Sequence, residues 1–203
     1  LFQKGNYLSA YWSARLSEQL GTFKLNLEKS IAGNFINNPL QLAALNSACC
    51  IIDSLLPERE PNPSIFEATL KLFNVINMSS NNNHKWLEGY IHWEIGLLSE
   101  LGFSLQLNEC VVSKVRENLA FVSPKTGNAV CYNEGMIYKD QLLTLPKFLG
   151  GNYNNKEINN LIDLKNGFKL SGYFLNSNFA NNSYKDFSSS RDWLKKLVLK
   201  LKI

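Results

Sequence analysis

The sequence lacks the features that would mark a membrane protein or a recognisable enzyme. No stretch of its 203 residues approaches the roughly 18 consecutive apolar residues of a membrane span. It has no glycine-rich phosphate loop and no nucleophile elbow. Of its two histidines, neither His84 nor His92 has a carboxylate partner that the sequence can assign. We therefore expect a non-enzymatic protein with no catalytic residues, no cofactor, no membrane partner and no small-molecule substrate.

Composition and charge allow a folded core but say little about partners. The hydrophobic fraction of 45% suits a globular protein, and the net charge of +4 only weakly favours an anionic partner. The four cysteines (Cys49, Cys50, Cys110 and Cys131) fit a reducing compartment. The chain starts at Leu1 without an initiator Met or a signal-peptide run, so we expect it to be the interior of a longer protein.

The first 30 residues alternate with the period of two that is typical of strands. Residues 6–16 and 20–29 form the two runs, with a turn over residues 17–21. Two strands do not make a stable sheet alone, so further strands or the rest of the chain must support them. Lys4, Arg15 and Lys24 interleave with aromatic residues such as Tyr11, a pattern that suits single-stranded nucleic acid. A half-buried strand pair with scattered surface charge explains the pattern equally well.

Helical periodicity follows, interrupted by one predicted hairpin. Apolar residues recur at helical spacing after Pro39, after Pro63, over 84–102, over 155–178 and from about 188. Residues 132–149 read as a short helix or an irregular segment. The fold class is therefore α+β and mostly helical. In the last helix we expect Trp193 to face inward with Leu194 and Leu197, while Lys195, Lys196 and Lys200 face solvent as a second candidate anion-binding surface.

Glu94 lies in the middle of the apolar face of the helix predicted over 84–102. An isolated buried carboxylate is very costly, so Glu94 must be paired or hydrogen-bonded. The chain has four arginines. We expect Arg59 as the partner, with Arg15, Arg116 and Arg191 as alternatives. A role for Glu94 as a general acid is the less favoured reading.

The hairpin over residues 110–134 has half the ligands of a zinc ribbon. Cys110 and Cys131 flank it, but Ser113 and Glu134 occupy the two places where a four-cysteine site would repeat the thiol. Serine is a poor zinc ligand and glutamate is an unusual fourth one. We expect a hairpin that holds no metal.

Several segments together resemble the RecO family of bacterial recombination mediators. The matching segments lie in order and span most of the chain: Gly5–Phe23, Leu56–Phe66, Trp93–Phe103 and Ser123–Gly127. The resemblance implies an N-terminal OB barrel followed by a helical domain with an inserted zinc-finger-like hairpin. It places the barrel part at residues 1–33, without its first strands, and the helical domain at 36–203. The zinc positions match the family at Cys110 and Cys131 only.

The resemblance also implies an activity and its partners. Family members bind single- and double-stranded DNA, anneal strands, act with RecR, and displace single-strand binding protein so that recombinase can load. They are cytoplasmic and act at the bacterial nucleoid. We expect Lys4, Tyr11, Arg15 and Lys24 to contact DNA. The alternative is a helical protein–protein adaptor that does not bind DNA itself.

Overall fold

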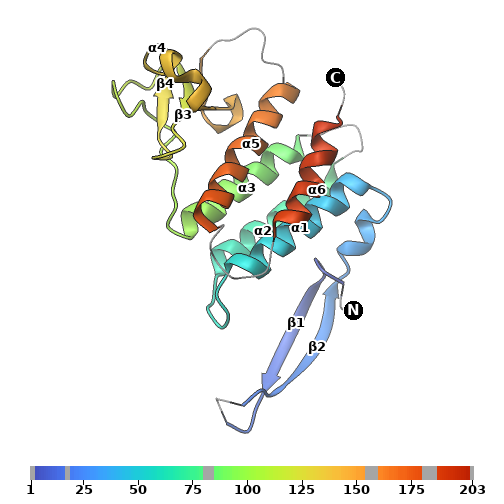
Figure 1. The fold of residues 1–203 in the computed structure, drawn as a ribbon. Helices are drawn as coiled ribbons and strands as arrows, with labels where there is room; N and C mark the ends of the chain where they lie inside the picture. Colours follow the sequence, from blue (N-terminus) through green and yellow to red (C-terminus); the bar gives the residue numbers. More distant parts are fainter. Residues whose placement is uncertain (1–2, 17–18, 80–84, 154–159, 180–186, 202–203) are drawn as a thin grey trace.

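The computed structural model describes residues 3–16, 19–79, 85–153, 160–179 and 187–201. A hairpin of β1 (Tyr7–Ser13) and β2 (Thr22–Lys29) comes first. The helical body follows, and a small β module is inserted between α3 and α5 (Figure 1). The body consists of η1 (Ala32–Phe35), α1 (Pro39–Leu55), α2 (Pro63–Met78), α3 (Trp86–Glu100), α5 (Asn160–Phe179) and α6 (Ser188–Leu199). The mixed, mostly helical class expected from the sequence is confirmed. Across the described ranges, no helix has the length and apolar character to cross a membrane.

Local sequence signals set the ends of the helices. At the start of α1, the Asn38 side chain accepts hydrogen bonds from the backbone N–H groups of Leu40 and Gln41 at 3.1 and 3.2 Å. At the end of α3, Gly102 adopts φ +89°, and its N–H donates to Ser99 O. Phe103 N–H donates to Leu98 O at 2.8 Å, which completes a Schellman motif. The predicted end of this helix at Gly102 is confirmed, whereas His84 lies outside the described residues.

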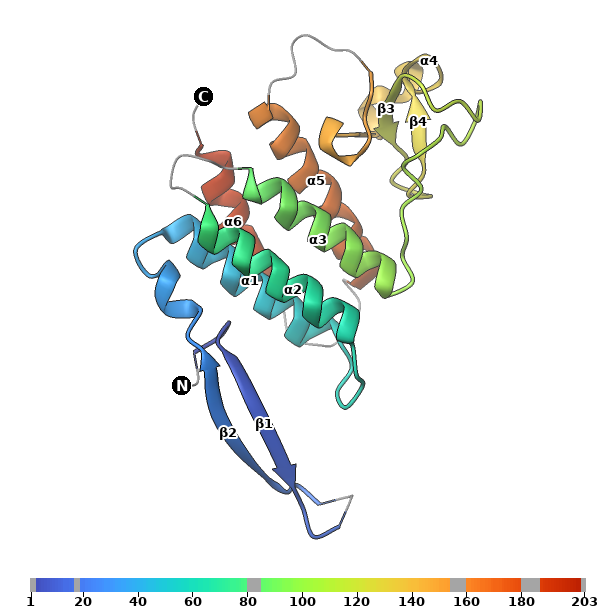
Figure 2. The same ribbon diagram turned by 180° about the vertical axis from the view of Figure 1, so that it is seen from behind.

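Helix α3 is the centre of the body. It packs against α2 on one side and α5 on the other, while α1 packs against α6 (Figure 2). Its buried polar atoms are satisfied: Tyr90 Oη donates to Ser47 Oγ at 2.7 Å, and Trp93 Nε1 donates to Thr69 Oγ1 at 3.1 Å. The apolar residues of α3 that are fully buried are Leu87, Ile91 and Leu98. The neighbouring helices therefore cover the apolar face that the sequence predicts for this helix.

The inserted β module lies beside α5. Its elements are β3 (Leu119–Val122), β4 (Ala129–Cys131), α4 (Tyr132–Gly135), η2 (Met136–Gln141), β5 (Leu143–Thr144) and η3 (Lys147–Leu149). The sheet has the order β4-β3-β5 with antiparallel neighbours. Strand β5 and the turn η3 contact α5. The sequence predicts a short helix or an irregular segment over residues 132–149. In the structure this segment forms the short helical elements α4, η2 and η3 and the strand β5.

Candidate nucleic-acid interface

The β1–β2 hairpin projects away from the helical body and is held at its root (Figures 1 and 2). Asn6 Oδ1 accepts hydrogen bonds from the backbone N–H groups of Ile31 and Ala32 at 3.0 and 3.1 Å. The Tyr7 ring lies 5.7 Å from that of Phe66 on α2. These contacts fix the direction of the hairpin, and its far end stands clear of the helices.

The strand register gives the hairpin two chemically different faces. Its polar face carries Ser9, Tyr11, Ser13, Thr22, Lys24 and Asn26. Its apolar face carries Leu8, Ala10, Trp12, Phe23, Leu25 and Leu27. Trp12 lies opposite Phe23, and these side chains are 47% and 63% exposed. The sequence predicts that Trp12 lies on the other face from Tyr11 and in a core. The face is confirmed, but the burial is wrong, because none of the described helices covers Trp12 and Phe23.

The structure brings only part of the predicted DNA-binding set together. Tyr11 and Lys24 are direct cross-strand partners, and Tyr11 is 65% exposed. Arg15 is exposed just beyond the end of β1, at the tip of the hairpin. Lys4 precedes β1 at the opposite end, where its Nζ donates to Cys50 Sγ at 3.6 Å. Lys4 therefore lies apart from the cross-strand pair of Tyr11 and Lys24 and from Arg15 at the tip.

Lys4 lies instead at a hollow between α1 and α6. With Trp193, Ser189 and Ser190 it lines a surface hollow of about 320 Å³. Trp193 is 55% exposed, so the prediction that it faces inward is wrong. Helical spacing places Ser189, Trp193, Lys196 and Lys200 along one side of α6. Three of the four residues three and four positions from Trp193 are polar (Ser189, Ser190 and Lys196), and this is the sequence signal that sequence reasoning missed.

In the hairpin over residues 110–134, the hydroxyl group of Ser113 contacts both cysteines. Ser113 Oγ lies 3.5 Å from Cys131 Sγ and also hydrogen-bonds to the Cys110 thiol. Burial raises the pKa of Cys110, but the Ser113 hydroxyl and the backbone N–H groups of Ser113, Cys131 and Val112 outweigh it and lower the pKa to about 7. Glu134 is exposed on α4. Within the part of the chain that the structure describes, no three His, Cys, Asp or Glu side chains converge as a metal site.

We expect the purified protein to contain no stoichiometric zinc. The reason is that Cys110 and Cys131 supply only two thiolates, and a structural zinc site needs four ligands. Elemental analysis of protein purified without a chelator measures this directly. One zinc per chain would contradict the prediction. A Ser113→Cys variant, which adds a third thiol, is the comparison that shows whether the site can regain metal.

Glu94 is fully buried, as predicted, but its partner is Arg191 and the prediction of Arg59 is wrong. Arg191 Nε donates to Oε1 at 2.7 Å and Nη2 donates to Oε2 at 2.8 Å. Nη2 also donates to Phe168 O and Ser171 Oγ, and Ser171 Oγ donates to Glu94 Oε2 at 2.5 Å. Burial alone would lower the pKa of Arg191, but the Glu94 carboxylate raises it well above its usual value. The pair therefore joins α3, α5 and α6 as a structural element.

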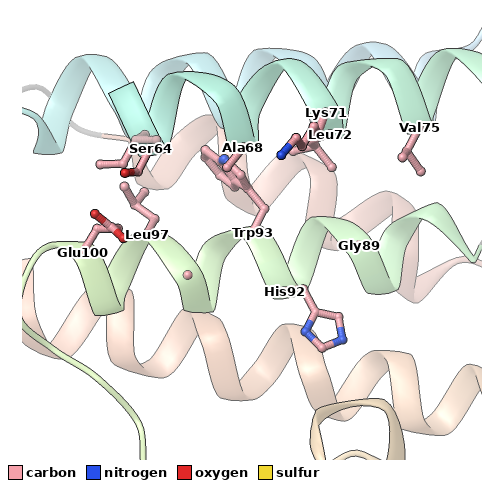
Figure 3. Close-up of a pocket in the computed structure, with 12 residues that line it drawn as sticks. Ser64, Ala68, Lys71, Leu72, Val75, Gly89, His92, Trp93, Leu97 and Glu100 are labelled. Atoms are coloured by element: carbon pink, nitrogen blue, oxygen red, sulfur yellow. The ribbon is translucent and has the colours of Figure 1, made fainter. Parts of the chain in front are cut away.

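An apolar groove runs between α2 and α3 (Figure 3). It has a volume of about 400 Å³, and Trp93 reaches from α3 toward α2 at its centre. A Cβ atom on Gly89 or Gly96 would meet nothing within 4 Å, so the α3 side of the groove is open. The His92 ring packs instead near Phe148, at 5.7 Å. The groove is lined by Ser64, Ile65, Ala68, Lys71, Leu72, Val75, Gly89, His92, Trp93, Gly96, Leu97 and Glu100.

Comparison with known proteins identifies the family. The family model described as "Recombination protein O C terminal" matches residues 36–185, which include most of the helical body and the β module. The chain belongs to the RecO family. Membership in the RecO family makes it a protein of DNA repair and recombination. The recognition made from the sequence is confirmed.

Individual RecO proteins match over most of the chain. The "DNA repair protein RecO" of Rhodospirillum centenum is 44% identical over 177 residues, which cover 86% of this chain and 67% of that protein. The RecO of Ehrlichia chaffeensis is 36% identical over 197 residues, covering 97% of this chain and 80% of that protein. The RecO of a Wolbachia strain of Drosophila simulans is 40% identical over 177 residues, or 86% and 72% of the two chains. No solved structure matches the chain.

Proposed function

We propose that this RecO-family protein is a non-enzymatic recombination mediator that binds DNA on the polar face of its β1–β2 hairpin. The observation that carries the proposal is the cross-strand pair of Tyr11 and Lys24 on an uncovered sheet face. An exposed aromatic ring beside a cation offers a base a stacking platform and a phosphate a counter-charge. Arg15 adds an exposed positive charge at the tip of the hairpin.

The apolar face supports an OB-type arrangement of this hairpin. Exposed Trp12 and Phe23 on an isolated strand pair form a surface that a sheet protein normally covers. We infer that further strands close over this face as a barrel, with residues 1–33 as its C-terminal part and the helical domain beginning at residue 36. In such a barrel the apolar face is inside and the polar face, with Tyr11 and Lys24, stays outside.

The finer activity follows from this surface and from the family. Capture of phosphates by cations and stacking of bases on aromatic rings suit single strands, and they also hold complementary strands for annealing. RecR and single-strand binding protein are the protein partners that we propose for the helical domain. Loading of recombinase onto strands coated with single-strand binding protein is the resulting role, and the site of action is the cytoplasmic nucleoid.

Substitutions on the polar face should weaken DNA binding in two distinguishable ways. Tyr11→Ala should cost about 1–3 kcal/mol of binding free energy if its ring stacks a base. Arg15→Ala should weaken binding to all sequences alike. Loss of one phosphate contact should make the slope of log K against log salt concentration shallower by about 0.7 to 0.9, because fewer counterions are released. Fluorescence anisotropy of labelled single strands over a range of salt concentrations measures both effects.

Matched variants test whether the surface is chosen correctly. Phe23→Leu changes an aromatic residue on the apolar face that is nearly as exposed as Tyr11, and Lys71→Ala removes a cation from α2. Both should leave the affinity for DNA nearly unchanged. If charge reversal at Lys196 and Lys200 abolishes binding while the hairpin variants keep wild-type affinity, the DNA-binding surface is on α6 with Trp193 and Lys4.

The alternative function is a helical protein–protein adaptor without DNA binding of its own. The apolar groove between α2 and α3 favours it, because an open apolar hollow of this size accepts side chains of a partner. The two functions differ in their response to salt. Affinity for oligonucleotides that falls steeply with salt supports the DNA-binding function, and the absence of any such binding supports the adaptor.

A further inference from the structure

A small hollow in the β module has a buried carboxylate at its base. The hollow has a volume of about 150 Å³ and lies between β3, α4, the residues around Gly151, and the start of α5. Asp163 lines it and is only 6% exposed. Asp163 Oδ2 accepts the backbone N–H of Lys147 at 2.8 Å. Asp163 Oδ1 is buried and has no hydrogen-bond partner among the described residues.

An unpartnered carboxylate oxygen inside a protein is costly and needs a reason. A buried acceptor without a donor loses its hydration and receives nothing in return. Burial raises the pKa of Asp163, while the Lys147 backbone N–H, the Lys147 charge and the Phe148 backbone N–H act in the opposite direction. The bond from Lys147 explains why an acidic residue lies here, since it caps the turn η3. This bond does not explain why the other oxygen, Oδ1, is buried without a hydrogen-bond donor.

We propose that this hollow receives the ammonium group of a lysine from a partner polypeptide, with the Asp163 carboxylate as its counter-charge. The volume lies below the 300–1,000 Å³ of most small-molecule sites and suits one side chain. Leu119, Ala120 and Leu145 line the hollow, so its walls can cover the methylene stem of a lysine. A cation that enters would pair with the carboxylate in a site largely shielded from water.

The remaining geometry favours lysine over arginine. Oδ2 is already committed to the turn η3, so one oxygen is left to accept. The guanidinium fork pairs best with two carboxylate oxygens, whereas an ammonium group is a point charge that one oxygen can hold. The rings of Phe121, Tyr132 and Tyr153 form a stack at the same hollow, with centroid separations of 6.3 and 3.9 Å. Their electron-rich surface adds to the attraction for a cation.

Two other occupants make different predictions. Lys147 also lines the hollow, and its side chain could turn inward to Oδ1, although no ion pair between Lys147 and Asp163 is present in the described structure. Solvent could also fill the space, because a cavity of this size holds several waters. Besides Asp163, the ionisable residues that line the hollow are Lys147, Tyr132 and Tyr153.

The test is an NMR titration of the full chain with N-acetyl-lysine methylamide and, in parallel, with its neutral isostere N-acetyl-norleucine methylamide. We expect saturable shifts at Phe121, Tyr132 and Tyr153 with the lysine compound only. Asp163→Asn should abolish them, because the amide keeps one oxygen for the Lys147 N–H but loses the charge. Lys147→Met should preserve or strengthen binding by removing a like charge from the rim.

Each other outcome overturns the proposal. Equal shifts with the lysine and norleucine compounds would show an apolar site without charge recognition. No shifts in the wild-type protein, combined with binding after Lys147→Met, would assign the hollow to Lys147 itself. No binding in either protein would leave it to solvent. The comparison of the two compounds uses the wild-type protein, so it decides the question even if Asp163→Asn fails to fold.

Discussion

Glu94→Ala is expected to lower the free energy of unfolding by about 3–5 kcal/mol, because it leaves the Arg191 guanidinium buried without its counter-charge. Both side chains of the pair are almost completely buried, at 0% and 5% exposure. Solvent therefore cannot replace the missing carboxylate. Chemical denaturation followed by circular dichroism measures the change, and the melting temperature should fall with it.

A double variant separates the loss of the pair from the cost of an orphaned charge. Glu94→Leu with Arg191→Met replaces both ions by apolar side chains of comparable size, which is often neutral or stabilising for buried pairs. The double variant should be more stable than either single variant. Arg59→Ala is the matched control for removal of an arginine, and it should have little effect. If Glu94→Ala unfolds at the same denaturant concentration as the wild-type protein, the pair does not stabilise the fold.

The second large effect is expected at Gly172, which faces the same guanidinium group from α5. A Cβ atom at this position would lie 2.2 Å from Arg191 Nη1 and 2.8 Å from its Cζ. Gly172→Ala must therefore displace the guanidinium, which Glu94, Ser171 and the Phe168 carbonyl hold in place, and overpacking of this kind costs about 1–3 kcal/mol. Equilibrium unfolding in urea measures the loss.

Gly96→Ala on α3 is the control for the same chemical change. Its Cβ would meet nothing within 4 Å, so the substitution should stabilise the helix by about 0.5–1 kcal/mol. The two variants should therefore shift stability in opposite directions. Equal shifts would mean that helix propensity decides the outcome and that the contact with Arg191 does not.

Local patterns in the sequence predicted the elements well, because each depends on residues close together in the chain. The alternation in residues 6–16 and 20–29 gave both strands and the correct faces for Tyr11 and Trp12. Helical spacing and Gly102 gave α3 and its end. The burial of Glu94 also followed, since a helix face is defined by spacing alone. The same reasoning gave the mostly helical fold class.

Features that depend on distant parts of the chain were not accessible in this way. The sequence favours Arg59, in the turn Pro57–Pro61, as the partner of Glu94, yet Arg191 reaches Glu94 from 97 positions away. Lys4 was grouped with Arg15 by proximity in sequence, although it lies at the opposite end of the hairpin. The amphipathic spacing of the last helix predicts that Trp193 faces inward with Leu194 and Leu197, but in the fold it lines an open hollow between α1 and α6 and is 55% exposed. The hollow at Asp163 joins β3, α4 and α5, and no local pattern indicates it.

The distance along the chain between Glu94 and Arg191 also affects how the protein forms during translation. At about 5–20 residues per second, Arg191 is synthesised roughly 5–20 s after Glu94, because 97 residues separate them. During this interval, tight packing around the middle of α3 would bury a carboxylate with no counter-charge. Helices α1 to α3 should therefore stay loosely associated on the ribosome until α6 emerges. The last helix thus sets the moment at which the nascent body can close.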